Sequence, residues 1–305
     1  MVDIMKTTRF SFVLGSCALS VLAIFAIVHP STGAAAPTEN IVHRGWGLLW
    51  PENSMAALER CWQAGFIPEA DARISSDGVP YIYHDPTYKG RKVSQMTWAE
   101  MKAIDIGAKK GEKWKGTYPP TLDEVFAAMA GHPDRRIAMD HKNLPNDKLH
   151  ELAKKHGVEK QIYYCTGGSA GIRDWCRRVP GAHSVLWLYG GSWKKLNFAD
   201  AVEIEKREAF MKERFDGLAA TGFTDLDIVE LIVYAHPTDP TSFCPRAPFL
   251  KDAAQRIRAA GKKPAIMVWS EGEKVQTYRN LANLLGDVLF GTDYPETLEE
   301  YLKAK

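Results

Sequence analysis

Short runs rich in β-branched and aromatic residues alternate with helical segments along most of this chain. Such alternation indicates parallel strands covered by helices, because parallel neighbours need a long crossover connection. The expected strands are residues 41–45, 66–72 extended by 81–84, 136–141, 161–165, 184–188, either 217–220 or 231–235, 264–269 and 288–292. With the extension counted as part of its strand, this sequence of elements over residues 37–305 predicts an α/β fold, a single (β/α)8 TIM barrel.

The helices between these strands have recognisable start signals. Thr97 with Glu100 and Thr121 with Glu124 have the spacing of capping boxes, which satisfy backbone amides at the start of a helix. Residues 146–156 place their apolar side chains on one face, which predicts a helix there. These signals support the alternation expected of a barrel.

The first 36 residues differ from the rest and are typical of an export signal. A short start with basic residues precedes an apolar run over 10–28 and small residues over 31–36. The apolar run is also long enough for an uncleaved membrane anchor. Residues 14–17 resemble a lipoprotein box, although little apolar sequence precedes them. We expect an exported chain, periplasmic or secreted, that contacts a membrane only through an uncleaved anchor.

The overall charge argues against a protein held on nucleic acid by a strong basic field. The chain has 39 basic and 37 acidic side chains, a formal net charge of +2. Any anion that it binds must therefore be met by local charge. We expect a small-molecule partner and no nucleic acid.

Four cysteines follow the export segment: Cys61, Cys165, Cys176 and Cys244. None has the CxxC spacing of a zinc knuckle or a thioredoxin-type site. An oxidising compartment would permit a disulfide, for which Cys165 and Cys176 are the nearest pair. Buried thiols explain the pattern equally well.

Acidic side chains gather where the expected strands end, which is the edge that carries active sites in such barrels. Glu69 and Asp71 point to the same face of their strand because side chains alternate with period two, and Asp140 ends the next strand. Carboxylates held this close repel one another unless a cation or a proton lies between them. They predict a site for one divalent cation, Mg²⁺ or Ca²⁺. An ordinary exposed Glu-x-Asp pair is the alternative.

Imidazoles and cations occur at the same strand ends. His43 and His84 each end a run, and an imidazole gives or takes a proton near neutral pH. Arg44 and Lys142 bring positive charge that suits phosphate oxygens. Taken singly, each histidine could be a structural hydrogen-bonding group and each cation a solvated surface charge. Together with the carboxylates they predict metal-assisted phosphoryl chemistry.

The motifs follow one another in a definite order along the chain. They are His43-Arg44-Gly45, Pro51-Glu52-Asn53-Ser54, Glu69-x-Asp71, Asp77-Gly78 with His84-Asp85, Pro120-Thr121-Leu122-Asp123-Glu124, Asp140-x-Lys142, Trp269 and Thr292-Asp293-Tyr294-Pro295. In order and spacing they resemble the signature of the glycerophosphodiester phosphodiesterase family. Each motif alone is weak, but their succession from residue 43 to residue 295 is specific.

The resemblance implies a (β/α)8 barrel that hydrolyses glycerophosphodiesters to glycerol 3-phosphate and an alcohol with the help of a divalent cation, a reaction of lipid metabolism. By motif position, it implies that His43 and His84 are the general base and acid. It also implies that Glu69, Asp71 and Asp140 hold the metal.

The substrate-binding residues are implied by the same resemblance. Arg44 and Lys142 would bind the phosphoryl oxygens, and Glu52 would lie in the glycerol or metal-supporting shell. Trp269 would line the alcohol end of the pocket, and a buried core Trp is the alternative. Whether a cyclic phosphate forms is not decided by these residues.

Some positions depart from the family pattern or need a separate interpretation. Asp140 stands where Glu is commoner, and the shorter side chain withdraws the carboxylate by about 1.5 Å. Ser54 stands where Thr is commoner, and a hydroxyl cap survives the change. His141 alternates to the face opposite Asp140, so we expect it to pack in the core or to support the site.

Two other readings share the same barrel. One is a phospholipase C-like or sphingomyelinase D-like enzyme that acts on a different diester. The other is a barrel that only binds phosphodiesters, against which the presence of both His43 and His84 argues.

Overall fold

A computed structural model of the chain describes residues 38–269 and 273–305. The predicted export segment, residues 1–36, lies outside the described residues, so its boundary with the barrel stays a prediction. Within the part of the chain that is described, no helix combines the length and the apolar character needed to cross a membrane.

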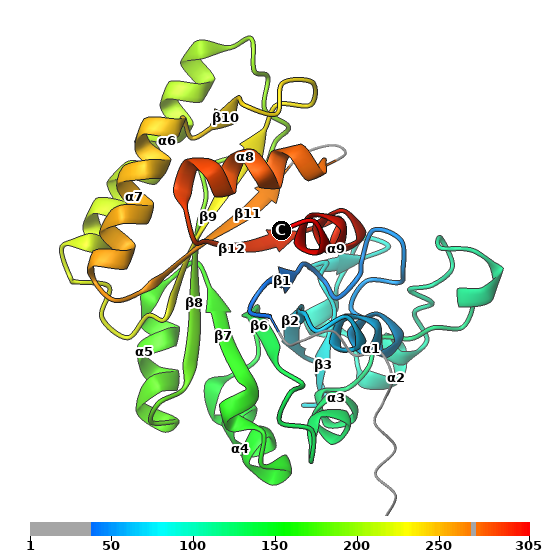
Figure 1. The fold of residues 1–305 in the computed structure, drawn as a ribbon. Coiled ribbons are helices and arrows are strands. Elements are labelled where there is room, and N and C mark those ends of the chain that lie inside the picture. The colour runs from blue at the N-terminus through cyan, green and yellow to red at the C-terminus, as the bar shows by residue number, and fades with distance from the viewer. Residues whose placement is uncertain (1–37, 270–272) are drawn as a thin grey trace, which may run out of the picture. The chain divides into compact units, whose positions relative to one another are not determined.

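Parallel strands close into a barrel, as predicted. In barrel order, the described strands are β1 (Ile41–Val42), β2 (Ile67–Ile74), β6 (Ile137–His141), β7 (Ile162–Thr166), β8 (His183–Leu188), β9 (Ile228–Ala235), β11 (Lys263–Trp269) and β12 (Leu289–Thr292). The short strand β1 closes the barrel because it pairs in parallel with both β2 and β12. Helices lie around the outside of the strands (Figure 1).

The helices begin and end where the sequence carries the matching signals. They are α1 (Met55–Gln63), α2 (Trp98–Lys102), α3 (Leu122–Met129), α4 (Asn146–His156), α5 (Ser169–Arg178), α6 (Ala201–Ala219), α7 (Ala247–Ala259), α8 (Val275–Leu285) and α9 (Pro295–Lys303). Both predicted capping boxes are formed, at Thr97 for α2 and at Thr121 for α3. The hydroxyl of Ser54 accepts from the Ala57 amide at the start of α1, so the cap survives the Thr-to-Ser difference.

Strands outside the closed barrel extend it at one side. Strand β3 (Pro80–Ile82) pairs antiparallel with β2 and is the predicted extension. The pair β4 (Thr87–Tyr88) and β5 (Arg91–Lys92) follows it, and β10 (Phe243–Cys244) pairs antiparallel with β9. The chain between β3 and α3 reaches away from the strands in Figure 1.

Two predicted strand boundaries are resolved by the structure. Of the two ranges expected for the sixth strand, 231–235 is confirmed because it lies in β9. The alternative at 217–220 is helical through Ala219, the last residue of α6. Strand β1 ends at Val42, earlier than predicted, because Arg44 and Gly45 both take positive φ and turn the chain.

The core forms two layers, as expected of a barrel whose strand residues alternate between faces. The larger layer lies between the sheet and the helices and includes Trp175 and Phe126. A smaller cluster fills the barrel interior, with Tyr163 and Ile228 among its members. All four described cysteines are free thiols, and three of them are buried.

Candidate active site

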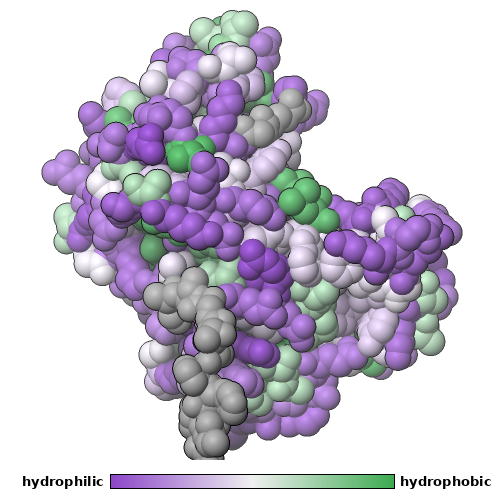
Figure 2. Space-filling model, turned by 45° about the vertical axis from the view of Figure 1, so that its right-hand side comes forward, coloured by the Kyte–Doolittle hydropathy of each residue, from purple (hydrophilic) through white to green (hydrophobic). Residues whose placement is uncertain are grey.

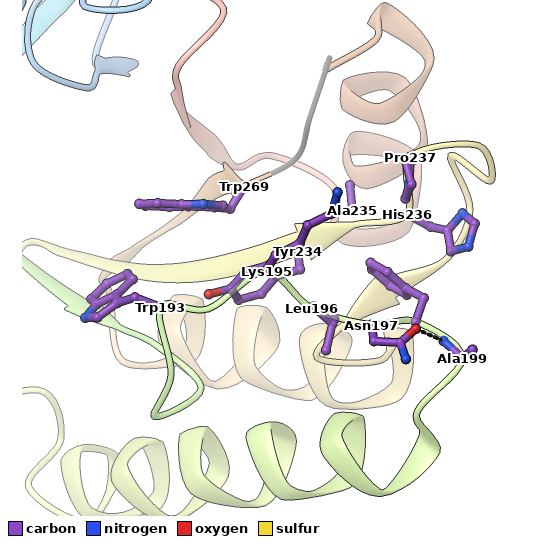
Figure 3. A pocket seen from close by; sticks show the side chains of 11 residues that line it. Trp193, Lys195, Leu196, Asn197, Ala199, Tyr234, Ala235, His236, Pro237 and Trp269 are labelled. Carbon is purple, nitrogen blue, oxygen red and sulfur yellow. Dashed lines mark hydrogen bonds between the residues drawn. The ribbon is translucent and has the colours of Figure 1, made fainter.

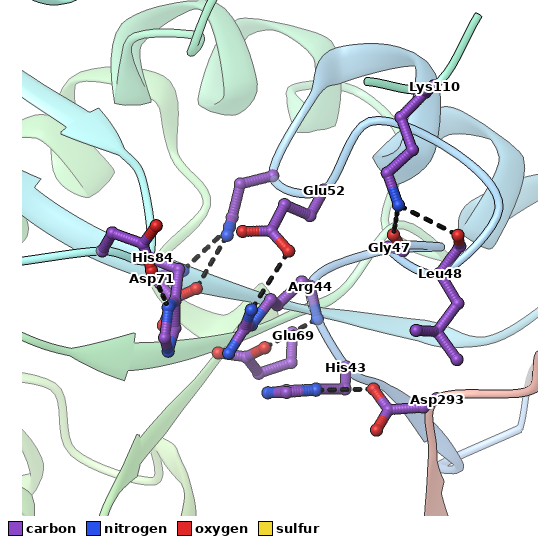
Figure 4. A network of polar contacts seen from close by, with 12 residues as sticks. His43, Arg44, Gly47, Leu48, Glu52, Glu69, Asp71, His84, Lys110 and Asp293 are labelled. Carbon is purple, nitrogen blue, oxygen red and sulfur yellow. Dashed lines mark hydrogen bonds and ion pairs between the residues drawn. The ribbon is translucent and has the colours of Figure 1, made fainter. Parts of the chain in front are cut away.

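The predicted site residues converge on one cavity of about 510 Å³. Its lining is Ile41, His43, Arg44, Glu69, His84, Asp140, Lys142, Cys165, Trp187, Trp193, Glu230, Ile232, Met267 and Trp269. Of the predicted residues, only Asp71 and Glu52 lie just outside this lining, and each contacts one of its members. Figure 4 shows most of the polar members.

Three carboxylates from two neighbouring strands form the acidic cluster that the sequence predicts. Strands β2 and β6 pair in parallel with Asp71 opposite Asp140, and Glu69 lies on the same face two residues before Asp71. One oxygen from each of the three carboxylates lies within 4.8 Å of the others. An all-oxygen donor set of this kind fits Mg²⁺ or Ca²⁺ better than a soft metal.

Lys142 supplies the positive charge that this cluster requires. Its Nζ lies 3.0 Å from Asp71 Oδ1 and 2.6 Å from Asp140 Oδ2. Burial would raise the pKa of Asp71, but the ammonium of Lys142 and the amide of Asn53 outweigh it and lower that pKa. Burial dominates at Asp140, whose pKa is raised. One lysine therefore does not balance all the acids.

Glu69 shows the remaining imbalance most clearly. Burial, followed by the charge of Asp71, raises the pKa of Glu69 to about 8. Its Oε2 accepts a hydrogen bond from the Arg44 amide at 2.8 Å, which fixes the carboxylate toward the cavity. A buried carboxylate with so high a pKa needs a proton or a cation, so the residues present fit a divalent ion.

His43 lies at the end of β1 and is held by a residue from the other end of the chain. Its Nδ1 lies 2.7 Å from Asp293 Oδ1, just after β12 (Figure 4). Burial alone would lower the pKa of His43, but the Asp293 hydrogen bond and the charge of Glu69 raise it to about 9. The ring thus keeps a proton at neutral pH and presents Nε2 as the free nitrogen.

His84 reaches the cavity from the segment after β3. Arg73, on β2, donates to the backbone oxygens of Tyr83 and His84 at 2.8 and 2.6 Å. The imidazole Nδ1 lies 2.9 Å from Asp85 Oδ1. Both predicted histidines are thus oriented through Nδ1 by a carboxylate.

The loop after β1 positions Arg44, which the resemblance assigns to the phosphoryl oxygens. Arg44 takes φ 51° and its Nη1 donates to Glu52 at 3.0 Å. Among the described residues, its buried Nε has no hydrogen-bond partner. Asn53, also at positive φ, donates to Asp71 Oδ2 at 2.7 Å and accepts from the Asp71 amide.

His141 turns away from the cavity, as the alternation of side chains requires. Its ring packs at a tilt against Tyr164 with centroids 5.0 Å apart, and burial lowers its pKa to about 4. A neutral imidazole packed under the helices is a structural residue.

A second cavity of about 740 Å³ adjoins the first. Figure 3 shows its lining, which comes from the loop after β8, the end of β9 and the end of β11. Trp193 and Trp269 line both cavities, so the two share a wall. Ring contacts continue from His43 to Trp269 at 5.7 Å and from Trp269 to Trp193 at 5.5 Å. Trp269 is thus a cavity residue and not a core one.

Sequence reasoning did not assign four residues that the structure brings to the site. Asp293 and Asn53 were part of the quoted motifs, but their partners lie 250 and 18 residues away, which spacing alone does not reveal. Trp193 stands in a loop without periodicity. Glu230 lies in the middle of β9 and resembles a strand residue like any other.

Comparison with known proteins supports the same assignment. Residues 43–165 match the profile of the Glycerophosphoryl diester phosphodiesterase family, and this stretch contains every ionisable residue predicted for the site.

Over this stretch the chain is similar to that family.

A curated glycerophosphodiester phosphodiesterase from Caldanaerobacter subterraneus subsp. tengcongensis is 30% identical over 152 residues, or 46% of this chain and 62% of that protein. This chain thus matches less than two thirds of the length of that family member.

Solved structures show the same fold at low identity. A glycerophosphodiester phosphodiesterase from Agrobacterium tumefaciens aligns over 86% of this chain and 100% of its own, with 22% identity and a TM-score of 0.58. A phosphodiesterase from Oleispira antarctica, solved with its product sn-glycerol-3-phosphate, aligns over 88% and 97%, with 19% identity and a TM-score of 0.63. Both confirm the barrel fold of this chain.

Proposed function

We propose that this chain hydrolyses glycerophosphodiesters to glycerol 3-phosphate and an alcohol, with one divalent cation. The observation that carries the proposal is the convergence of His43, His84 and the acidic cluster on a single cavity. Similarity to the family and the glycerol 3-phosphate bound to the Oleispira antarctica relative support the same reaction.

The two cationic side chains bind the phosphoryl group in this proposal. The side chains of Arg44 and Lys142 both line the cavity and suit the nonbridging oxygens. Glu52 holds the Arg44 guanidinium in place. A divalent cation held by Glu69, Asp71 and Asp140 would neutralise further charge on those oxygens when bound.

The two imidazoles divide the proton transfers between them. His43 holds a proton because Asp293 and Glu69 raise its pKa to about 9, so we assign it to protonate the leaving alcohol, which reverses the order of base and acid that the resemblance implies. His84 then takes the proton from the attacking oxygen. Its Nδ1 contact with Asp85 leaves Nε2 as the nitrogen that accepts.

The alcohol leaves toward the second cavity. Trp269 packs against His43, the proposed proton donor, and forms the wall between the two cavities. An alcohol that departs from the phosphorus next to His43 therefore meets the tryptophan wall, formed by Trp193 and Trp269, and not the acidic cluster.

The test is release of glycerol 3-phosphate from a panel of free glycerophosphodiesters, with Mg²⁺, Ca²⁺ or chelator present. We expect cation-dependent release, and full turnover after exhaustive chelation would contradict the metal. Turnover of intact phospholipids or sphingomyelin, without turnover of free diesters, would favour the phospholipase C-like or sphingomyelinase D-like reading. Glu69→Gln, which removes one proposed metal ligand, should lower this release. Glu230→Gln is its matched control, because both acids line the same cavity.

We further propose that the chain is exported, on the basis of the apolar segment before residue 34. Fractionation of cells that express the full chain tests this proposal. Recovery of the intact chain in the cytosol would contradict it, and sequencing of the mature N-terminus separates cleavage from anchoring.

A further inference from the structure

Two loops at the rim of the active site form an exposed surface that is both apolar and basic. The first is the loop 47–50, and the second is the loop 107–118; together we call them the rim patch. Among the described residues, the exposed large apolar side chains are Leu48, Leu49, Tyr118, Trp193, Val202 and Phe210. The first three of them belong to the rim patch.

The two loops are joined by direct contacts. Lys110 Nζ donates to the backbone oxygens of Gly47 and Leu48 at 2.6 and 2.9 Å (Figure 4). The rings of Trp50 and Trp114 lie 4.8 Å apart, and Lys113 lies over both. The two loops therefore present one surface.

The second loop is built to keep its shape. Asp105 accepts from the amides of Gly107 and Gly116, each at 2.9 Å, and so ties the two ends of the loop together. A side chain at position 107 would meet the backbone oxygen of Trp114 at 1.9 Å, so only glycine allows this closure. The loop is pre-organised, which lowers the entropy lost on binding.

The leucines project outward and are not covered by the other described residues. Leu48 is 45% exposed and Leu49 is 63% exposed. The face of the molecule in Figure 2 is largely hydrophilic, with apolar residues in small separate groups. Adjacent exposed leucines on such a surface mark an interaction site more often than isolated ones do.

The charge around these leucines is positive. The loop 107–118 carries four lysines, Lys109, Lys110, Lys113 and Lys115, and a single acid, Glu112, which pairs with Lys115 at 2.6 Å. Here the lysines lie next to exposed leucines and half-buried tryptophans, a composition typical of segments that lie in the interface of an anionic membrane.

We propose that the rim patch docks on an anionic lipid surface. Leu48 and Leu49 would enter the acyl region while the lysines contact anionic headgroups. A second copy of the chain is a poorer occupant, because a symmetric contact would oppose lysine to lysine. The membrane contact expected from the sequence was confined to the N-terminal segment, and this surface is independent of it.

Docking at the rim patch turns the catalytic cavity toward the membrane. Gly47 lies close to the side chains of Arg44, which lines the cavity, and Glu52, which holds the Arg44 guanidinium, so the leucine loop adjoins the site. The inference does not depend on the proposed reaction, because binding is measured without turnover.

The first test is hydrogen exchange of the full chain, measured peptide by peptide with vesicles. Phosphatidylcholine vesicles with and without phosphatidylglycerol are compared. We expect slower exchange over residues 46–50 and 107–118 with the anionic vesicles only. Binding without protection of these residues would overturn the proposal, and so would protection that grows with protein concentration in the absence of vesicles, which would indicate a second copy.

The second test is co-sedimentation of variants with the same vesicles. Leu48→Asp combined with Leu49→Asp should lower the partition coefficient about tenfold. Val202→Asp is the matched control, because Val202 is 74% exposed on α6, away from the rim patch. Every variant keeps residues 1–36, so any affinity of that segment is common to all.

Charge and folding are checked on the same proteins. Lys109→Glu combined with Lys113→Glu should remove the preference for anionic vesicles, and added salt should weaken wild-type binding. Equal melting temperatures would show that the variants fold. Equal partition of wild type and of both double variants would overturn the proposal.

Discussion

The two halves of the barrel contribute different chemistry to one cavity. The half from β1 to β7, which contains the stretch matched by the family profile, supplies the histidines, the carboxylate cluster and the cations. The half from β8 to β12, outside that stretch, supplies Trp187, Trp193 and Trp269, with Glu230 as its acid in the cavity. Charged groups that act on a phosphate must keep fixed distances, whereas an apolar wall needs only shape.

The difference suggests a division of labour within the barrel. In the proposed function, the first half would perform the hydrolysis and the second half would determine which alcohol fits. One residue from the second half crosses the divide, because Asp293 orients His43 from the end of β12. The predictions below test whether the division holds.

The largest effect is expected in the acidic cluster. Glu69→Gln should lower turnover by about 10³-fold and abolish tight cation binding, because it removes one of three oxygen donors. Glu230→Gln makes the same chemical change on the other side of the cavity, where burial raises the pKa of Glu230 to about 7. We expect the control to retain turnover within a few-fold. Cation affinity is measured by calorimetric titration of both variants. Similar losses of turnover and of cation affinity in the two variants would contradict a special role for the acidic cluster.

A smaller loss is expected at the imidazoles. His43→Ala and His84→Ala should each slow turnover by about 10²-fold while the melting temperature changes little. The pH profile of kcat/KM should be bell-shaped, with the alkaline limb due to His43. Asp293→Asn should move that limb to lower pH, because the Asp293 carboxylate raises the pKa of His43. A stable His→Ala variant with near-normal kcat would overturn the mechanism.

Much of the charged half could be predicted from the sequence. Side chains alternate along a strand, and strands of a barrel end at a common edge, so Glu69, Asp71, Asp140 and His43 could be assigned to one place without coordinates. The same alternation predicted that His141 lies on the face of its strand opposite Asp140, and the structure shows its ring packed against Tyr164.

The apolar half could not be predicted in the same way. Trp193 lies in the loop between β8 and α6, where no period constrains the side chains. The pairing of His43 with Asp293 spans 250 residues and depends on barrel closure. The sixth strand was left open because proline and threonine obscure its pattern, although all eight residues of β9 are buried.

A moderate effect is expected at the tryptophan wall. Trp193→Ala should raise KM about tenfold, or about 1.4 kcal/mol, for diesters with a large alcohol and leave kcat nearly unchanged. A diester with a methyl alcohol should show little change, because it does not reach the second cavity. Equal effects on both substrates in steady-state kinetics would place Trp193 in the reaction common to all substrates and would remove the division between the halves.

The smallest effect concerns stability and a buried acid beside the second half. Glu273 accepts a hydrogen bond from Thr292 Oγ1 at 2.7 Å and contacts the Tyr278 hydroxyl. Burial, assisted by the charge of Asp293 and opposed by the Thr292 hydrogen bond, raises the pKa of Glu273 from 4.5 to about 8. The folded chain therefore keeps this proton over a pH range in which the unfolded chain has lost it.

The sign of the pH dependence follows from that difference. Between pH 4.5 and 8 the folded state binds more protons at Glu273, so its contribution to the free energy of unfolding falls as the pH rises. Glu273→Gln cannot ionise and should flatten this dependence, while it changes the free energy of unfolding at pH 5 by only about 1 kcal/mol because the amide oxygen still accepts. Urea unfolding at pH 5, 6.5 and 8 measures the slope. Glu300→Gln, at an exposed position on α9, is the control that should keep the wild-type slope. If Glu273→Gln keeps the wild-type slope as well, Glu273 is ionised in the folded chain and its proton does not contribute to the pH dependence of stability.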